Sequence, residues 1–216
     1  MSFQRILGIA CEVCGLPLPG LAQHEGEPLL CPACQEKTYA FDRARSFAVY
    51  ADSLVRAILL LKFERIEPLG AWFADRLAEV VSAEGDRLAA DVVVPEPLHR
   101  QRERERGYNQ AALVSKPLAK RLRLPHKAVL LMRTRARPDK QVLTLEERWE
   151  SVRGAFATRP GSQVDNLRVL LVDDVLTTGA TLDACARALG DAGAKSVIGL
   201  TVARAVRNPL PSTREW

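Results

Sequence analysis

Four of the five cysteines stand in two Cys-x-x-Cys pairs, Cys11 with Cys14 and Cys31 with Cys34. Each pair can form a tight knuckle that places two thiolates on one metal ion, and the second pair then completes a tetrahedron. The segment between the pairs is rich in proline and glycine and too poor in apolar residues to build a core. The pattern predicts a zinc ion on all four cysteines, in a closed site that stabilises the fold and takes no part in catalysis.

Two disulfides are the alternative interpretation of the same four cysteines. Residues 1–10 hold too short an apolar stretch for a secretory signal, and no apolar run approaches the ~18–20 residues of a membrane span. We therefore expect a cytoplasmic protein, in a reducing compartment that disfavours disulfides. Gly15 follows the first knuckle and is expected in a turn with positive φ. Cys185 shares a helical stripe with Leu182 and Leu189, which predicts a core position.

A second chemical pattern combines carboxylates with hydroxyls. The apolar run Arg168-Val-Leu-Leu-Val172 leads into Asp173 and Asp174, and then into Thr177-Thr-Gly-Ala-Thr181. The threonine hydroxyls and the amides of a following helix can donate to phosphate oxygens, while Gly179 would let the backbone approach a ligand closely. The carboxylates suit the hydroxyls of a ribose or a divalent cation that accompanies the phosphates. A helix cap with acidic residues near the helix dipole is the alternative.

Charge is distributed unevenly along the chain. The 216 residues carry a formal net charge of +5, but residues 99–159 hold 16 lysines and arginines against 6 acidic residues. Such a basic segment favours a polyanionic partner, either phosphate groups or nucleic acid. A solvated surface of arginine and lysine is the alternative.

Alternating strand and helix patterns must position these groups. Apolar residues recur at helical spacing over 54–61 and 69–81, and a further helix is expected over 109–122. Short apolar runs predict strands, which we place at residues 45–50, 91–95, 128–132, 168–172 and 196–202. This alternation indicates an α/β fold with a mostly parallel sheet flanked by helices, in which ligands bind beyond the carboxyl ends of the strands.

The segment from Val172 to Thr181 resembles the signature with which type I phosphoribosyltransferases bind 5-phosphoribosyl 1-pyrophosphate (PRPP). Other segments narrow the resemblance to the ComF/GntX-like family of bacterial DNA uptake: the cysteine pairs, Val94-Pro-Glu-Pro-Leu98, Arg106-Gly-Tyr-Asn-Gln110, and the stretch from Arg133 through Gln141 to Arg148 and Phe156. The resemblance runs from Cys11 to about Arg204. It implies a small zinc ribbon over residues 1–40 and a type I phosphoribosyltransferase fold over residues 41–216.

The resemblance also implies roles for the matching residues. Asp173 and Asp174 would hold the ribose hydroxyls of PRPP and would stand, with Arg133, closest to the reaction. The 5-phosphate would be wrapped by Thr177, Thr178, Gly179, Ala180 and Thr181. The loop after Pro95 would bind the diphosphate, with Arg106 and Gly107 nearby. Residues 133–153 would contain a flexible lid, and Mg²⁺ would arrive mainly with the diphosphate.

Two positions depart from the family pattern. Glu96 stands where the family has valine, which places a carboxylate close to the expected diphosphate site. That carboxylate can orient the loop, help to hold Mg²⁺, or weaken PRPP binding. Ser151 stands where the family has asparagine in the lid. Both changes bear on turnover more than on the fold.

Three functions are compatible with these residues. The first is Mg²⁺-dependent displacement of pyrophosphate from PRPP by an unidentified nucleophile, in support of DNA uptake and natural transformation. The second is binding of single-stranded DNA, together with other competence proteins, with Tyr108 and Trp149 able to stack on bases. The third is a PRPP sensor without turnover. His99 and His126 are expected as unpartnered surface residues, so no general base stands out.

Overall fold

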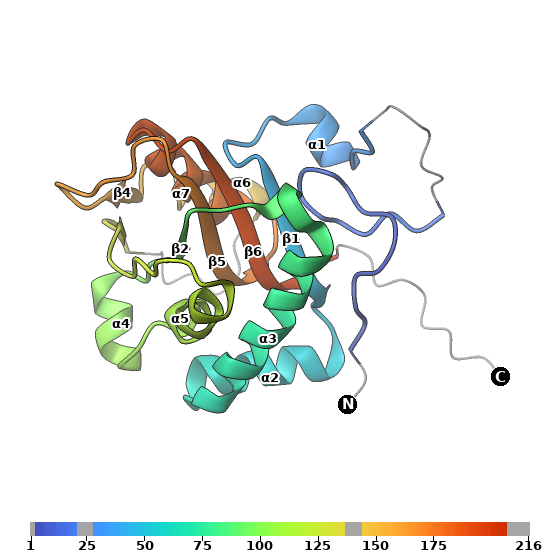
Figure 1. Ribbon diagram of the computed structural model, residues 1–216, viewed down its shortest axis with the longest axis horizontal. Helices are drawn as coiled ribbons and strands as arrows, with labels where there is room; N and C mark the ends of the chain where they lie inside the picture. Colours follow the sequence, from blue (N-terminus) through green and yellow to red (C-terminus); the bar gives the residue numbers. More distant parts are fainter. Residues whose placement is uncertain (1–2, 21–27, 137–143, 207–216) are drawn as a thin grey trace.

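Four parallel strands form the central sheet, in the order β1-β6-β5-β2 (Figure 1). The computed structural model describes residues 3–20, 28–136 and 144–206. The strands of the sheet are β1 (Arg43–Val49), β2 (Val92–Pro95), β5 (Arg168–Leu176) and β6 (Ser196–Arg204). The parallel sheet predicted from the apolar runs is confirmed, although β5 continues past its expected end at Val172 and includes both aspartates.

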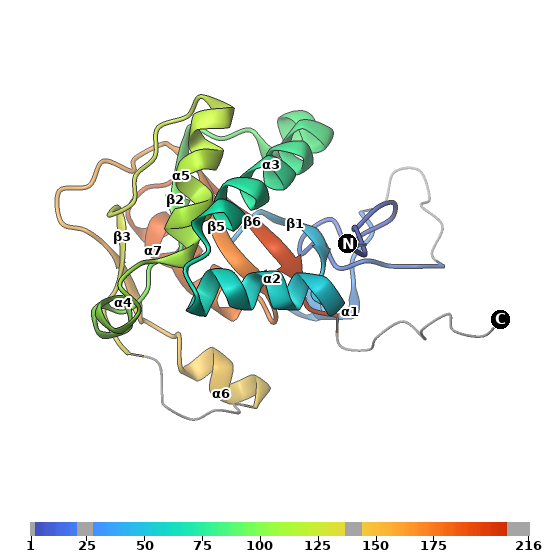
Figure 2. The same ribbon diagram turned by 90° about the horizontal axis from the view of Figure 1, so that it is seen from below.

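Side chains alternate along the strands and divide the core between the two faces of the sheet. Val92 and Val94 belong to the core on one face, whereas Val93 and Leu170 belong to the core on the other. The first face is covered by α7 (Ala180–Asp191); the second is covered by α2 (Asp52–Phe63), α3 (Glu67–Glu84) and α5 (Gln110–Leu122) (Figure 2). Burial on both faces explains the continuous apolar runs in the sequence. Cys185 lies fully buried on α7, as predicted.

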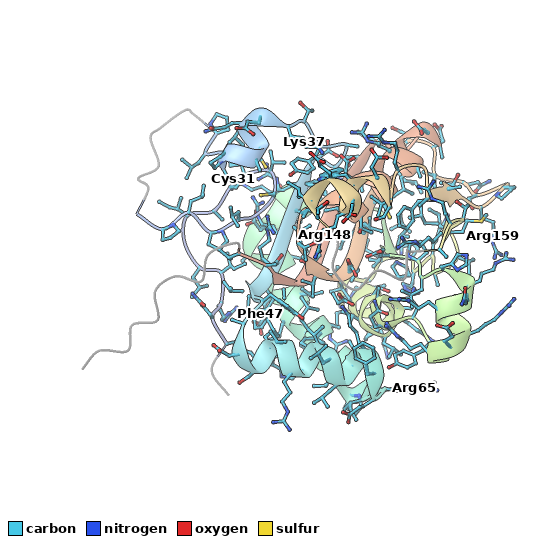
Figure 3. The ribbon with its side chains drawn as sticks, turned by 180° about the vertical axis from the view of Figure 1, so that it is seen from behind. Cys31, Lys37, Phe47, Arg65, Arg148 and Arg159 are labelled. Atoms are coloured by element: carbon cyan, nitrogen blue, oxygen red, sulfur yellow. The ribbon has the colours of Figure 1, made fainter. Side chains whose placement is uncertain are left out.

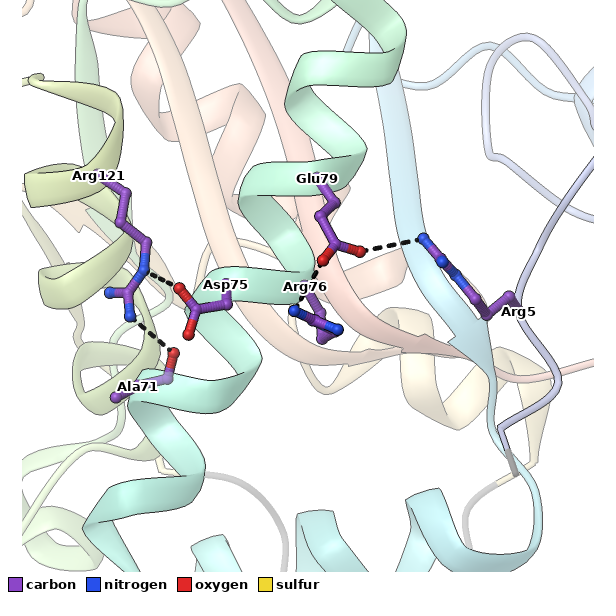
Figure 4. A network of polar contacts seen from close by, with 6 residues as sticks. All are labelled: Arg5, Ala71, Asp75, Arg76, Glu79 and Arg121. Carbon is purple, nitrogen blue, oxygen red and sulfur yellow. Dashed lines mark hydrogen bonds and ion pairs between the residues drawn. The ribbon is translucent and has the colours of Figure 1, made fainter. Parts of the chain in front are cut away.

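Ion pairs link α3 to α5 on one side and to the N-terminal segment on the other (Figure 4). Toward α5, Arg121 pairs with Asp75 and donates from Nη2 to the Ala71 carbonyl oxygen at 3.2 Å. On the other side, Arg5 Nη2 lies 3.2 Å from Glu79 Oε2. Because these groups are largely exposed, the pairs orient the helix more than they stabilise it. Across residues 3–20, 28–136 and 144–206, no helix combines the length and the apolar character needed to cross a membrane.

The strand predicted at residues 128–132 is wrong in its position and its partner. The Val93 amide donates to the Pro125 carbonyl oxygen at 2.9 Å, and the Val93 carbonyl oxygen accepts from the Lys127 amide at 3.0 Å. The backbone around residue 126 therefore takes the place beside β2. The chain then turns away, and β3 (Leu131–Arg133) pairs antiparallel with β4 (Phe156–Thr158) in a separate two-stranded sheet. An apolar run indicates burial, but it does not choose the strand's partner.

Short helices complete the chain: α1 (Pro32–Glu36), the 3₁₀ helix η1 (Gly85–Leu88), α4 (Arg100–Arg106) and α6 (Leu145–Glu150). Apolar periodicity does not predict α4 or α6, because neither has a buried stripe. A capping box starts α6: the Glu147 amide donates to Thr144 Oγ1 at 3.2 Å, and the Thr144 amide donates to Glu147 Oε2 at 2.8 Å. The Thr-x-x-Glu spacing is therefore the sequence signal for α6.

The cysteine module, which we define as residues 9–20 and 28–37, packs against β1. The Ala44 amide donates to the Val13 carbonyl oxygen at 2.7 Å. Gly15 has a φ of +64°, as expected, and a Cβ at this position would lie 2.7 Å from the Ala44 carbonyl oxygen. Glycine is required here by its conformation and by the close approach of β1.

Candidate functional site

A cavity of about 370 Å³ opens beyond the carboxyl ends of β2 and β5. This is the end of a parallel sheet at which ligands bind. Its wall also contains Ala180, and it combines cations, carboxylates and hydroxyls, which include Lys62, Glu96, Arg102, Arg106, Arg133, Arg148, Asp173, Asp174, Thr177, Thr178 and Thr181. This composition suits a charged, hydroxyl-rich ligand better than an apolar one.

The turn from β5 into α7 contributes the hydroxyls. Thr177, Thr178 and Thr181 lie in the cavity wall. The helix begins at Ala180, whose amide donates to Thr178 Oγ1 at 3.3 Å. The first amides of α7 therefore lie at the cavity, where the helix dipole favours an anion. The structure brings these residues together, and their contact with a phosphate stays a prediction.

Gly179 differs from its neighbours in the turn because it is not in the wall of this cavity. Its φ is +83°, and a Cβ here would lie 3.0 Å from Cε1 of Tyr39. A side chain is thus disfavoured by the left-handed conformation and by the ring packed behind the turn. The predicted approach of Gly179 to a ligand stays a prediction, and Gly179 lines a small second cavity together with Glu96 and Asp173.

The two aspartates of β5 have different partners. Lys62 Nζ lies 2.7 Å from Asp174 Oδ1. Asp174 is 4% exposed, and its Oδ2 has no hydrogen-bond partner among the described residues. Burial alone would lower the pKa of Lys62, but the charge and the hydrogen bond of Asp174 outweigh it and leave that pKa raised. The sequence analysis missed Lys62, since it stands on α2 at the end of an apolar run and nothing nearby in the chain indicates its partner.

Glu96 and Asp173 form a pair of carboxyl groups in the same wall. Desolvation raises the pKa of Asp173 well above its ordinary value, and the neighbouring charges of Glu96 and Asp174 raise it further. Desolvation also raises the pKa of Glu96, although a hydrogen bond with Asp173 opposes that shift. Burial and neighbouring charge thus disfavour the ionised form of both carboxyl groups.

The Arg-Gly-Tyr-Asn-Gln segment supports the cavity in more ways than its arginine suggests. Asn109 Nδ2 donates to the Glu96 carbonyl oxygen at 2.8 Å and so holds the loop after β2. Tyr108 donates from its hydroxyl to the Leu61 carbonyl oxygen at 2.7 Å. Arg106 lies in the cavity wall with its guanidinium over the Phe63 ring. Gly107 ends α4 in the left-handed conformation.

Two residues expected at the diphosphate, Pro95 and Gly107, are not in the cavity wall that the described residues form. Pro95 is the last residue of β2 and pairs with Val172. Both residues shape the loop that carries Glu96 and Arg106, and their predicted contact with a diphosphate stays a prediction.

The expected lid, residues 133–153, meets the cavity at both of its described ends. Arg133, Arg148 and Ser151 lie in the wall, and Ser151 Oγ donates to the Arg148 carbonyl oxygen at 2.8 Å. Residues 137–143, which include Gln141, lie outside the described residues. Figure 3 shows Arg148 on α6, which lies next to Lys37 beside the cysteine module.

The four cysteines of the module converge on one point. Their Sγ atoms all lie within 4.8 Å of one another, and those of Cys14 and Cys31 are 3.6 Å apart. Tetrahedral zinc with Zn–S bonds of about 2.3 Å separates its sulfurs by about 3.8 Å, so the four thiols fit a metal ion such as zinc in number, type and spacing. All five cysteines of the chain are free thiols, which does not match the disulfide alternative.

The thiols also influence one another's ionisation. A hydrogen bond from Cys14 lowers the pKa of Cys11 to about 4, while the same contact raises the pKa of Cys14. Burial raises the pKa of Cys34 to about 12. A cluster of this kind favours a thiolate that a bound cation would stabilise.

Four other residues singled out in the sequence have partners within the protein, and one of them, His99, also lies in the cavity wall. His126, expected to be unpartnered, shares a hydrogen bond of 2.8 Å between its Nε2 and Ser115 Oγ, because the backbone beside β2 brings it against α5. His99 caps α4 by accepting from the Gln101 amide. Tyr108 is buried and hydrogen-bonded, so it is not available to stack on bases. Trp149 packs against Tyr39, with Lys37 over its ring.

Comparison with known proteins agrees with this architecture. The phosphoribosyl transferase domain family matches residues 109–213. DNA utilization protein YhgH of Escherichia coli (strain K12) is 33% identical over 191 residues, which cover 87% of this chain and 80% of that protein. Competence protein F of Haemophilus influenzae is 28% identical over 200 residues, covering 90% and 84%. Competence protein ComFC of Bacillus subtilis is 29% identical over 211 residues, covering 94% and 81%.

Proposed function

Since the chain belongs to the ComF family, whose members carry a phosphoribosyltransferase domain, we propose that it binds PRPP with Mg²⁺ and displaces the pyrophosphate. The supporting observation is the meeting, in one cavity, of a helix-start turn with three threonines, two adjacent aspartates and several arginines. These groups match a 5-phosphate, a ribose and a diphosphate in chemistry.

Each part of PRPP has its own set of groups. The 5-phosphate accepts from the threonine hydroxyls and the amides at the start of α7. Asp173 and Asp174 accept from the ribose hydroxyls, and Lys62 fixes the orientation of Asp174. Arg106 and Arg133 neutralise the diphosphate as the bond from the ribose C1 to its oxygen breaks and the electron pair leaves with pyrophosphate. An acceptor then forms the new bond to C1, which has oxocarbenium-like character in the transition state.

The cavity fits Mg²⁺ through its oxygen donors. Carboxylate oxygens are the ligands that Mg²⁺ prefers, and Asp174 Oδ2 is buried without a partner among the described residues. Glu96 and Asp173 add two more carboxyl groups at the same wall. When bound, Mg²⁺ would neutralise charge on the diphosphate. For the cysteine module we propose Zn²⁺ in a structural role, because four thiols close its coordination shell.

We also propose that the protein serves DNA uptake or utilisation, in line with relatives that are named for DNA utilization and for competence. The exposed guanidinium groups of Arg100 and Arg104, which are not in the cavity wall, are candidates to contact single-stranded DNA. A PRPP sensor remains the alternative to an enzyme. Release of pyrophosphate, measured with candidate bases and single-stranded DNA as acceptors, discriminates the two.

Calorimetry of PRPP binding tests the assignment of the cavity. Asp173→Ala/Asp174→Ala should lose about 2–4 kcal/mol of Mg²⁺-dependent binding energy, since each charge-assisted hydrogen bond contributes roughly 1.5–3 kcal/mol. The matched control, Asp86→Ala/Asp191→Ala, removes two exposed carboxylates outside the wall and should bind as the wild type does. Equal affinity in the cavity variant would remove the assignment.

A further inference from the structure

Arg204, the last residue of β6, connects the cysteine module to the turn before α7. Its Nη1 donates to the carbonyl oxygens of Leu176 at 3.0 Å and Thr177 at 2.5 Å. Its Nη2 donates to Cys14 Sγ at 3.7 Å. The side chain is 7% exposed, so these contacts lie within the protein. One guanidinium thus bonds both to a cysteine of the metal site and to the backbone that leads into the phosphate turn.

Among the described residues, no carboxylate forms an ion pair with Arg204. The ion pairs found among residues 3–20, 28–136 and 144–206 do not include this arginine, and its Nε has no hydrogen-bond partner there. A buried cation is costly without a counter-charge. A cysteine that binds a metal is a thiolate, so a loaded module supplies the negative charge that Arg204 faces. Groups that hydrogen-bond to metal ligands also orient them and tune metal affinity.

The residues that follow the module support the same turn from behind. Tyr39 donates from its hydroxyl to the Thr178 carbonyl oxygen at 3.4 Å, and its ring lies against Gly179. The Ala40 amide donates to Asp183 Oδ1 on α7 at 2.7 Å. The turn is therefore held on one side by groups attached to the module, while its other side faces the cavity.

We propose that metal loading of the cysteine module sets the affinity of the phosphate turn, and that Arg204 is the positioning residue that couples the two sites. The metal-bound thiolate holds the guanidinium, and the guanidinium holds the carbonyls of Leu176 and Thr177 in the conformation that presents the turn to a phosphate. This coupling rests on the proposed binding of PRPP at the turn. By linkage, PRPP should also raise the affinity of the module for its metal.

The test compares PRPP binding by zinc-loaded and zinc-free protein, for the wild type and for Arg204→Gln. Zinc removal should weaken binding by the wild type at least five-fold, at the lower end of typical coupling between sites. Arg204→Gln should weaken binding in the zinc-loaded state, and zinc removal should then have little further effect. Arg204→Lys keeps the charge but not the fork of donors, and should behave as Arg204→Gln does. Arg168→Gln, at the opposite end of β5, is the matched control and should keep the zinc dependence.

Hydrogen exchange gives a readout that does not depend on PRPP. Amides of residues 177–181 should exchange faster after zinc removal and in zinc-loaded Arg204→Gln, while amides of residues 168–172 stay protected and report an intact sheet. Equal PRPP affinity with and without zinc would overturn the coupling and leave the proposed function standing. If zinc-loaded wild type fails to bind PRPP, both proposals fail together. Full zinc dependence in Arg204→Gln would exclude Arg204 as the connection.

Discussion

Glu96 shows how one side chain can alter a site without changing the fold. Its carboxyl group lies with that of Asp173 in the cavity wall. Desolvation raises the pKa of both groups, and the charges of Glu96 and Asp174 raise that of Asp173 further, so a bound cation must compete with a proton. Affinity for a cation at this pair therefore depends on pH.

Replacing Glu96 should stabilise the protein at neutral and higher pH. A carboxyl group whose folded pKa is raised contributes its stability below its unfolded pKa of about 4.3, and this contribution is lost as pH rises through the folded pKa. Glu96→Gln removes this loss of stability. It also removes the charge that helps to raise the pKa of Asp173. The free energy of unfolding in urea, without added Mg²⁺, should thus exceed that of the wild type by an amount that grows from pH 5 to pH 8. Each unit by which a pKa is raised corresponds to about 1.4 kcal/mol.

Glu103→Gln is the control for that series, because Glu103 is exposed on α4 and is not in the cavity wall. The free energy of unfolding of Glu103→Gln should differ from that of the wild type by the same amount at every pH. A Glu96→Gln protein that is less stable than the wild type at pH 8 would contradict the interaction between the two carboxyl groups.

Hydrogen bonds attach the cysteine module to the sheet. The backbone bond between Val13 and Ala44 crosses the boundary, and Arg45 Nη1 donates to the Glu12 carbonyl oxygen at 3.0 Å. We propose residues 1–40 and 41–216 as two domains with separate sources of stability. The module lacks an apolar core of its own and would depend on a bound metal, whereas the sheet is buried on both faces.

One zinc ion per chain is the expected result of metal analysis on protein purified without added zinc. Cys31→Ser should lose the metal and the hydrogen-exchange protection of the module, while β5 and β6 remain protected. Cys185→Ala removes a cysteine outside the cluster and should retain a full equivalent of zinc. Wild-type protein with well below half an equivalent of any transition metal would count against a metal site, and loss of protection in β5 would count against independent stability.

At the scale of the whole molecule, the basic segment is divided between two surfaces. Arg102 and Arg106 of α4 line the cavity, whereas Arg100 and Arg104 of the same helix do not. A cavity of about 370 Å³ is too small to admit a nucleic-acid strand together with PRPP. We therefore propose separate surfaces for PRPP and for DNA, with the outer arginines contacting phosphates of the strand.

Binding of labelled single-stranded DNA should accordingly be unchanged by saturating PRPP and Mg²⁺, while it weakens steeply with salt. Arg100→Gln/Arg104→Gln should weaken DNA binding several-fold and leave PRPP binding intact, whereas Arg106→Gln should do the reverse. Competition with matching inhibition constants, measured from both directions, would show that the two ligands share one site.

Local sequence determined the groups that stand close together in the chain, and tertiary structure decided which distant groups meet them. The two Cys-x-x-Cys pairs and the run from Asp173 to Thr181 act over a few residues, where knuckle, turn and helix start follow from local conformation. Parallel strands with buried faces were likewise readable from their apolar runs.

The pairing of Lys62 with Asp174, of Glu96 with Asp173, and of Arg204 with Cys14 depends on the order of strands in the sheet. The same holds for β3, whose partner β4 lies after the lid. Apolar periodicity indicates which residues are buried, but the contacts that tune charge and position arise only when the layers pack, because packing brings together side chains that are far apart along the chain.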